Sequence, residues 1–390
     1  MRITVDEFRD RVARCTRLME EERFDALVAY GSRVTYGSVR YLTGYEPWLA
    51  PEEWAFAVLT PGHGAGLSLL SNSPWDFWEF NRTQATWVSD VTVGSKWVEQ
   101  IAARLPRTAQ RVGLGGWAGF PARVLDGLRE RFPHAEFVDA TALIHKLRAI
   151  KSSAEIALLR RAGELGDLGA AALYESARPG ATEREVVAQI DGAMMRGGTE
   201  QMAYWTILGS GRKTIASCFL PTDRVLEEGD LVQLDCGPMV DGYKADFSRV
   251  VIVGKERPAA TVRLVETVAE VHERCAAKLR AGVRCSEIAR TGLDVIERRG
   301  YTRENLFRSA NYPDMVFMAH GIGLENPDPP GMLTLTNDAV LEEGMCINLE
   351  PILLDQQVGG ARIETSFAVT SGDPVRLSDA PIRPWLASAT

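Results

Sequence analysis

The stretch Leu231–Gly254, LVQLDCGPMVDGYKADFSRVVIVG, has the pattern of a β-hairpin. Two apolar runs flank a turn region that contains proline, aspartate and glycine. Two acidic residues, Asp235 and Asp246, fall inside the strands. If the turn is centred between Val240 and Asp241, the two acids lie opposite each other, with Cβ atoms about 4.5–5.5 Å apart. Two like charges this close repel, so either a cation such as a metal ion lies between them or both acids point to water.

A second hairpin near the end of the sequence repeats this arrangement. Glu350 and Glu364 flank the loop LDQQVGG at equal distances from Gln357. Between the hairpins, His320 lies in the segment AHGIG, beside glycines that allow close backbone approach. Four carboxylates buried in one cleft require cations. Carboxylate oxygens with one imidazole suit two divalent ions of Mn, Co, Fe or Zn, which lie about 3.5–4 Å apart in two-metal hydrolytic sites.

Composition limits the class of protein. The chain has 390 residues, 45% of them hydrophobic and 25% charged, as expected for a soluble globular protein of two or three domains. A formal net charge of −8 argues against nucleic acid or a membrane surface as partner. The start, MRITVDEFRD, lacks the apolar core of a secretory signal, and no apolar run approaches the ~20 residues of a membrane span. Six scattered cysteines without a CxxC pair indicate reduced thiols, so we expect a cytoplasmic protein with a small-molecule substrate.

Two domains are expected, residues 1–146 and residues 147–390. The first has the pattern of a small α/β domain and contains seven of the nine tryptophans, most of them expected in its core. Its loops Pro47–Trp54 and Pro74–Phe80 are predicted at an interface. In residues 1–146 we expect helices over Val5–Glu22 and Val124–Phe132, and strands at Ala26–Tyr30, Ala55–Leu59, Leu67–Leu70 and Val112–Leu114.

The second domain carries two capping boxes, which predict helix starts. Ser152 with Glu155, and Thr182 with Glu185, have the required spacing. The other expected elements are helices over Ala259–Leu279 and Ser286–Arg299, and strands around Tyr204–Leu208 and over Val340–Thr370.

With these motifs the sequence resembles the creatinase, prolidase and aminopeptidase P superfamily, which includes methionine aminopeptidases. Asp235-Cys-Gly, Gly242-Tyr and Asp246-Phe-Ser-Arg resemble the family pattern D-x-G…G-Y-x-x-D-x-T-R. Residues 362–364, RIE, resemble a second family motif. Residues 147–152, LRAIKS, resemble the junction between the family's two domains, and residues 40–45, RYLTGY, resemble a hallmark of its N-terminal domain.

The resemblance implies an α+β fold, with a C-terminal pita-bread catalytic domain and a smaller N-terminal α/β creatinase-like domain. It also implies a homodimer, in which the N-terminal domain of one subunit closes the active site of the other. The implied ligands of the two metal ions are Asp235, Asp246, His320, Glu350 and Glu364.

The sequence departs from the family beside these ligands. Aminopeptidase P and prolidase use two further histidines, and Cys218 and Pro327 stand at those positions. Ile352 and Leu354 replace the Gly and Tyr of the motif E-P-G-x-Y. Loss of one donor to a developing oxyanion costs a few kcal/mol of transition-state stabilisation. An ordinary peptidase is therefore not expected.

These residues predict a dinuclear metallohydrolase, resembling an Xaa-Pro peptidase, that cleaves an amide or amidine C–N bond of a small non-standard substrate. Glu350 is the expected proton shuttle, and Arg362 is expected to hold a substrate carboxylate. The expected substrate pocket contains Cys218, Tyr204, Pro327, Ile352 and Leu354. Two alternatives remain: a lyase that uses the same metals, and a non-catalytic binding protein with the same fold. Incorporation of oxygen from water into the product distinguishes a hydrolase from a lyase. Metal analysis of the purified protein distinguishes a metalloenzyme from a non-catalytic binding protein.

Overall fold

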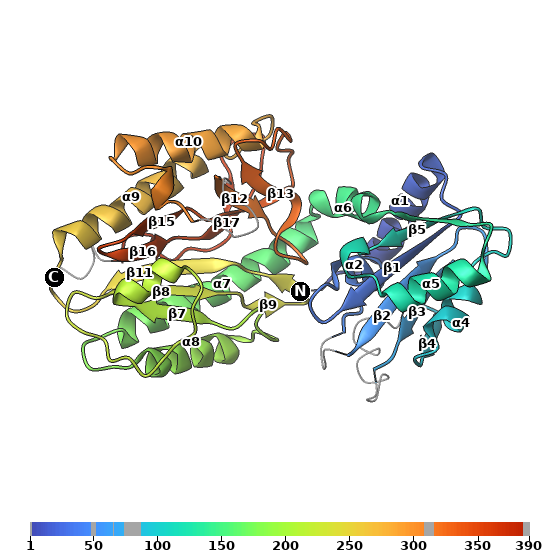
Figure 1. Cartoon of the computed structure of the whole chain (residues 1–390), viewed down its shortest axis with the longest axis horizontal. Coiled ribbons are helices and arrows are strands. Elements are labelled where there is room, and N and C mark those ends of the chain that lie inside the picture. The colour runs from blue at the N-terminus through green and yellow to red at the C-terminus, as the bar shows by residue number, and fades with distance from the viewer. Residues whose placement is uncertain (1, 48–51, 65, 74–86, 308–315, 385–390) are drawn as a thin grey trace. The chain divides into compact units, whose positions relative to one another are not determined.

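The computed structural model describes residues 2–47, 52–64, 66–73, 87–307 and 316–384. Figure 1 shows its two compact units, which divide the chain between Arg148 and Ala149. In the described residues, no helix combines the length and apolar character needed to cross a membrane.

The N-terminal unit is built on a six-stranded mixed sheet in the order β4-β3-β2-β1-β5-β6. Strands β1–β2 and β2–β3 pair antiparallel, and the other three pairs are parallel. The strands are β1 (Ala26–Ser32), β2 (Trp54–Leu59), β3 (Leu67–Ser71), β4 (Asp90–Val93), β5 (Arg111–Gly115) and β6 (Glu136–Asp139). The helices are α1 (Val5–Glu21), α2 (Gly37–Thr43), α4 (Trp97–Ala102), α5 (Ala122–Arg131) and α6 (Thr141–Ala149).

The core of this unit forms where α4 and α5 pack on the sheet. Trp97, Ile101 and Leu128 join buried residues of the central strands in one hydrophobic cluster. The expected tryptophan core is thus confirmed for Trp97, whereas Trp117 is partly exposed. Three of the tryptophans, and most of the two loops expected at an interface, lie outside the described residues.

The C-terminal unit places paired sheets between two layers of helices (Figure 1). Helices α7 (Ser153–Ser176) and α8 (Glu183–Gly197) start at the two predicted capping boxes, both of which are formed. They pack on the three-stranded sheet β11-β8-β7, formed by β7 (Ile207–Ser210), β8 (Leu231–Cys236) and β11 (Phe247–Ile252). The strand expected around Tyr204–Leu208 begins only at Ile207.

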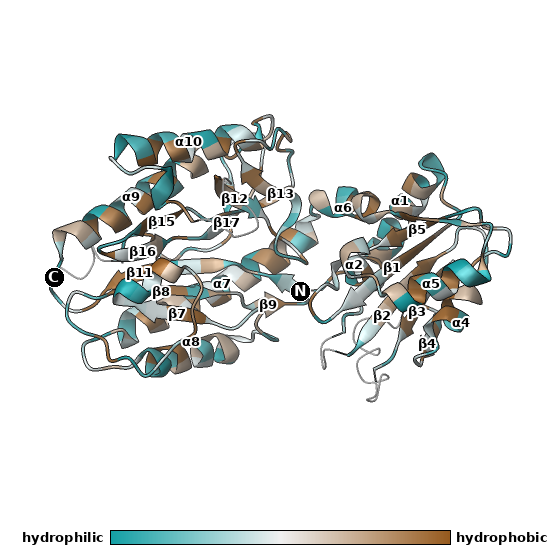
Figure 2. Ribbon diagram, in the orientation of Figure 1, coloured by the Kyte–Doolittle hydropathy of each residue, from teal (hydrophilic) through white to brown (hydrophobic). Residues whose placement is uncertain are grey.

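Helices α9 (Ala259–Ala276) and α10 (Cys285–Arg298) pack against the other sheet, which has the order β13-β12-β14-β17-β18. Figure 2 shows hydrophobic strands inside and hydrophilic outer faces on these helices. A β-bridge between Ser248 and Glu364 joins the two halves. The remaining strands are β9 (Met239–Val240), β10 (Tyr243–Lys244), β12 (Phe317–Gly321), β13 (Asp328–Thr334), β14 (Cys346–Leu349), β15 (Ile352–Asp355), β16 (Gly359–Arg362), β17 (Thr365–Ala368) and β18 (Val375–Arg376).

The first hairpin forms, but its register differs from the prediction. Asp235 lies opposite Ser248 and not opposite Asp246. The turn is centred one residue later than expected, at Asp241-Gly242, where both residues have positive φ (51° and 76°) as a type I′ turn requires. A shift of the turn centre by one residue moves the pairing by two. Because side chains alternate along a strand, Asp246 stays on the same face as Asp235, as its diagonal neighbour.

The second hairpin has the predicted register. Strands β15 and β16 pair Ile352 with Arg362 and Asp355 with Gly359, which centres the hairpin on Gln357. Glu350 and Glu364 therefore lie at equal distances from the turn, just beyond the paired residues of β15 and β16, where this hairpin meets the five-stranded sheet.

Candidate metal centre

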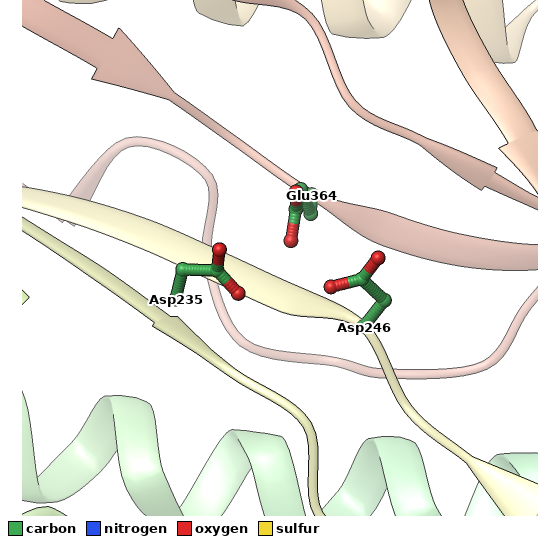
Figure 3. A group of neighbouring side chains, drawn as sticks. All are labelled: Asp235, Asp246 and Glu364. Carbon is green, nitrogen blue, oxygen red and sulfur yellow. The ribbon is translucent and has the colours of Figure 1, made fainter. Parts of the chain in front are cut away.

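Acidic side chains from both hairpins converge in the middle of the C-terminal unit. Asp235 is on β8, Asp246 immediately precedes β11, and Glu364 connects β16 to β17. Carboxylate oxygens of these three residues lie within 4.8 Å of one another (Figure 3). All three side chains are buried. Strand pairing, and not proximity in sequence, holds the three negative charges together.

His320 and Glu350 complete the cluster. His320 Nε2, on β12, lies 3.0 Å from Asp246 Oδ2 and 3.4 Å from Glu350 Oε2. Its Nδ1 lies 3.0 Å from the carbonyl oxygen of Gly321, which can only accept a hydrogen bond. This contact leaves Nε2 directed at the acids, the arrangement that metal-binding histidines adopt. Burial lowers the pKa of His320, but hydrogen bonds to Asp246 and Glu350 outweigh it and raise the pKa to about 10.

The cluster fits divalent cations. Glu364 is 0% exposed, and neither of its carboxylate oxygens has a hydrogen-bond partner. Burial and the charges of Asp246 and Asp235 raise the pKa of Glu364 well above its usual value. Burial and the charge of Asp246 also raise the pKa of Asp235 to about 7, against the effect of Arg362. Buried acids with unmet negative charge are what a bound divalent ion stabilises.

Tyr204 aligns two of the ligands. Its hydroxyl lies 2.6 Å from Asp235 Oδ1 and 2.5 Å from Asp246 Oδ1. Burial and the neighbouring carboxylates raise the pKa of Tyr204 well above its ordinary value, so the phenol stays protonated and donates. Tyr204 was expected in the substrate pocket, and it does line the cavity described below.

The terminal nitrogens of Arg362 contact the acidic cluster. Its Nη2 lies 2.8 Å from Asp235 Oδ2 and donates to the carbonyl oxygen of Ser217 over 2.8 Å. Its Nη1 lies 3.0 Å from Glu350 Oε1 and 3.6 Å from Glu364 Oε1. The four terminal N–H groups thus face four acceptors, the Nε–H has no hydrogen-bond partner, and the residue is 4% exposed. This geometry favours charge compensation within the ligand cluster over the expected contact with a substrate carboxylate.

A cavity of about 290 Å³ opens above the ligands. Cys218, Tyr204, Pro327 and Ile352 line it, but Leu354 does not. Leu354 lies two residues further along β15, about 7 Å away at the usual rise of a strand. The other lining residues are Ile207, Ser217, Asp235, Asp246, Phe307, Phe317, His320, Asn326, Met332, Glu350 and Arg362.

Asn326 is a lining residue that sequence reasoning missed. Its Nδ2 donates to Asp246 Oδ2 over 2.7 Å, so it directly holds a carboxylate of the candidate metal centre. The residue immediately precedes Pro327, which was expected in the substrate pocket, and this adjacency could have indicated that Asn326 lines the cavity. Ser217, Phe307, Phe317 and Met332 were also not anticipated. Ser217 directly precedes Cys218, whereas Phe307, Phe317 and Met332 lie outside the quoted family motifs.

Two aspartates, two glutamates and one histidine, buried at the floor of a cavity between paired sheets, define a metal-dependent hydrolase with a pita-bread fold. The chain belongs to metallopeptidase family M24, whose model matches residues 157–371. The model of the creatinase/prolidase N-terminal domain matches residues 11–150. These matches confirm the superfamily and fold class expected from the motifs.

Individual relatives agree with this assignment. The Xaa-Pro dipeptidase of Pyrococcus horikoshii is 29% identical over 265 residues, which cover 68% of this chain and 72% of that protein. The Xaa-Pro dipeptidase of Lactobacillus helveticus is 31% identical over 246 residues, 62% of this chain and 64% of that protein. The crystal structure of the prolidase from Pyrococcus horikoshii superposes with a TM-score of 0.80, covering 95% of this chain and 99% of that one at 24% identity. At that identity the superposition supports the fold alone.

Proposed function

We propose that the chain is a dinuclear hydrolase, loaded with two ions of Mn, Co, Fe or Zn, that cleaves an amide or amidine C–N bond of a small non-standard substrate. The observation that carries the proposal is the convergence of five ligand side chains at the floor of a mainly apolar cavity. Divalent ions bound there supply Lewis acidity, which lowers the pKa of a bound water and polarises a carbonyl.

Glu350 is the proposed proton shuttle. Of the two glutamates, Glu350 lines the cavity and Glu364 does not. Arg362 Nη1 holds Glu350 Oε1 at 3.0 Å, which fixes the orientation of the carboxylate. A carboxylate fixed at the cavity wall can accept a proton from water and deliver it to the leaving nitrogen.

The altered pocket supports a non-standard substrate. Cys218 and Pro327 line the cavity at the positions where the family's histidines are expected. Neither side chain supplies the imidazole donor that stabilises a developing oxyanion. Two neutral donors beside the candidate ligands, Tyr204 and Asn326, already contact Asp246. The cavity is therefore better suited to apolar substrates than to zwitterionic dipeptides.

The test is hydrolysis in ¹⁸O-labelled water by protein reloaded with Mn²⁺ or Co²⁺, with N-acyl amino acids, their amides and Xaa-Pro dipeptides as substrates. We expect one labelled oxygen per turnover in the carboxyl product, loss of turnover on chelation, and recovery when metal returns. Product without labelled oxygen would contradict hydrolysis and indicate a lyase. Activity that survives complete metal removal would contradict the proposal, and a protein that binds no metal would be a binding protein.

A further inference from the structure

The cavity wall above the ligand cluster is apolar. Phe307, Phe317, Met332 and Ile352 line it together with Ile207 and Pro327. The rings of Phe307 and Phe317 meet edge to face, with centroids 6.2 Å apart. Such a surface favours an apolar substituent, because contact removes its surface from water.

The charged groups of the cavity are already engaged with one another. Among the described residues that line it, the acidic and basic ones are Asp235, Asp246, His320, Glu350 and Arg362. His320 faces Asp246 and Glu350. The four terminal N–H groups of Arg362 face Asp235, Glu350, Glu364 and the carbonyl oxygen of Ser217. Among the described side chains of the cavity wall, the one cationic N–H without an acceptor is therefore the buried Nε of Arg362.

A neutral polar atom of the cavity wall also lacks a hydrogen-bond partner. Ser217 is 1% exposed, lines the cavity, and its Oγ has no hydrogen-bond partner. The residue has a φ of 62°, a conformation that costs energy for any residue except glycine. A strained serine with an unpaired hydroxyl at a site wall is suited to an uncharged polar atom of a ligand.

From these observations we propose the substrate class: an N-acyl compound whose group beyond the scissile nitrogen is uncharged and apolar, such as a carboxamide or ester, and not a free carboxylate. This inference rests on the proposed function. Against the apolar wall, away from the ligand cluster, a carboxylate would lack a cationic side chain, whereas a carboxamide of nearly the same shape can hydrogen-bond to a neutral group such as the Ser217 hydroxyl.

The experiment compares matched substrates that differ only in this charge. Metal-loaded protein is assayed with N-acetyl-phenylalanine against N-acetyl-phenylalaninamide, and with glycyl-proline against glycyl-prolinamide. We expect kcat/KM for the amide to exceed that for the acid by about tenfold or more in each pair. A preference for the free acid would overturn the proposal.

A charge introduced into the cavity should reverse this preference. Cys218 is exposed and lines the cavity, so Cys218→Lys places a cation at the wall without disturbing the core. Leu220, on the same segment, is 64% exposed and does not line the cavity, so Leu220→Lys is the matched control. We expect Cys218→Lys to lower the amide-to-acid ratio by about tenfold and Leu220→Lys to leave it unchanged. Equal ratios in the two variants would contradict the proposed location of the uncharged group.

Calorimetric titration of the same pairs separates this inference from the proposed function. If neither member of a pair is hydrolysed but the amide binds metal-loaded protein more tightly, the proposed reaction fails and the inference stands. If both are hydrolysed and the acid is preferred, the inference fails and the reaction stands.

Discussion

Arg362 places a permanent positive charge among four buried carboxylates, and this charge keeps the ligand residues together before metal binds. Three of the four acids, Asp235, Glu350 and Glu364, lie within 3.6 Å of its terminal nitrogens. Removing one partner of a buried ion pair is strongly destabilising, because the remaining charge has no counter-ion.

Arg362→Met should therefore destabilise the metal-free protein by about 3–5 kcal/mol at neutral pH. Saturating metal should recover part of this loss, because the ions then compensate the same carboxylates. Chemical denaturation with and without metal measures both effects. Unchanged stability of the metal-free variant, together with a raised KM for carboxylate substrates alone, would support the carboxylate-binding role expected from the sequence.

We expect Asn326 to affect metal binding through Asp246. Its amide donates to Asp246 Oδ2, so Asn326→Leu frees that carboxylate to rotate. Loss of such a partner of a metal ligand costs about 10–100-fold in metal affinity or activity. We expect a decrease of that size in a titration of metal against a competing chelator. An affinity equal to that of the wild type would show that Asp246 is oriented by Tyr204 and His320 alone.

At the scale of secondary-structure elements, the sequence predicted the position of a helix or strand where a capping motif or a continuous apolar run marks it. The capping boxes at Ser152 and Thr182 located the starts of α7 and α8, and buried runs located β1 and β2. Short elements such as α2, α4 and β6 were missed, because they are too short to show a period. The predicted register of the first hairpin differs by two residues from the observed register. The pair Asp241-Gly242, which is frequent in type I′ turns, could have indicated the correct turn centre.

The register of the first hairpin depends on Gly242, which has a φ of 76°. Gly242→Ala should cost about 1–2 kcal/mol, because an L side chain strains this conformation. It should also lower metal content, since the turn sets the position of Asp246. Gly180→Ala is the control: Gly180 has a φ of 92° and no neighbour that an added Cβ would meet.

Thermal melts and metal analysis of the two glycine variants test this role. Both should lose stability, but Gly242→Ala alone should lose metal. Equal metal content in the two would show that the turn does not determine the ligand geometry.

At the scale of the whole molecule, the sequence motifs predicted which five candidate ligand side chains converge in the C-terminal unit. The contacts of Arg362 with the acidic cluster were not predicted, since one of its partners, Asp235, comes from the other hairpin. The cavity wall was only partly accessible, because Phe307, Met332 and Ser217 reach it through tertiary packing. A motif identifies its own residues and does not specify which distant segments face them.

Stability of the whole chain should fall in mild acid through His272. This residue of α9 is buried against Phe367, and neither ring nitrogen has a hydrogen-bond partner. Burial and the nearby charge of Arg249 lower the pKa of His272 well below its ordinary value. Below the unfolded pKa of about 6.5, the unfolded chain binds a proton that the folded chain does not, so stability is lost as pH falls.

The expected contribution of His272 is about 2 kcal/mol between pH 7 and pH 5. His272→Leu should remove this part of the pH dependence, and substitution of the exposed His134 by Gln is the control. Urea denaturation at several pH values measures the difference. An identical slope in His272→Leu and the wild type would contradict the account.

The central claim, a two-metal centre built by both hairpins, is tested most directly by metal stoichiometry. Protein is loaded with Mn²⁺, dialysed, and analysed for metal per chain, beside Glu364→Gln, which removes the buried carboxylate without a hydrogen-bond partner. The account predicts two ions per wild-type chain and at most one in the variant. A wild-type chain that retains no metal, or a variant that retains two ions, would contradict it.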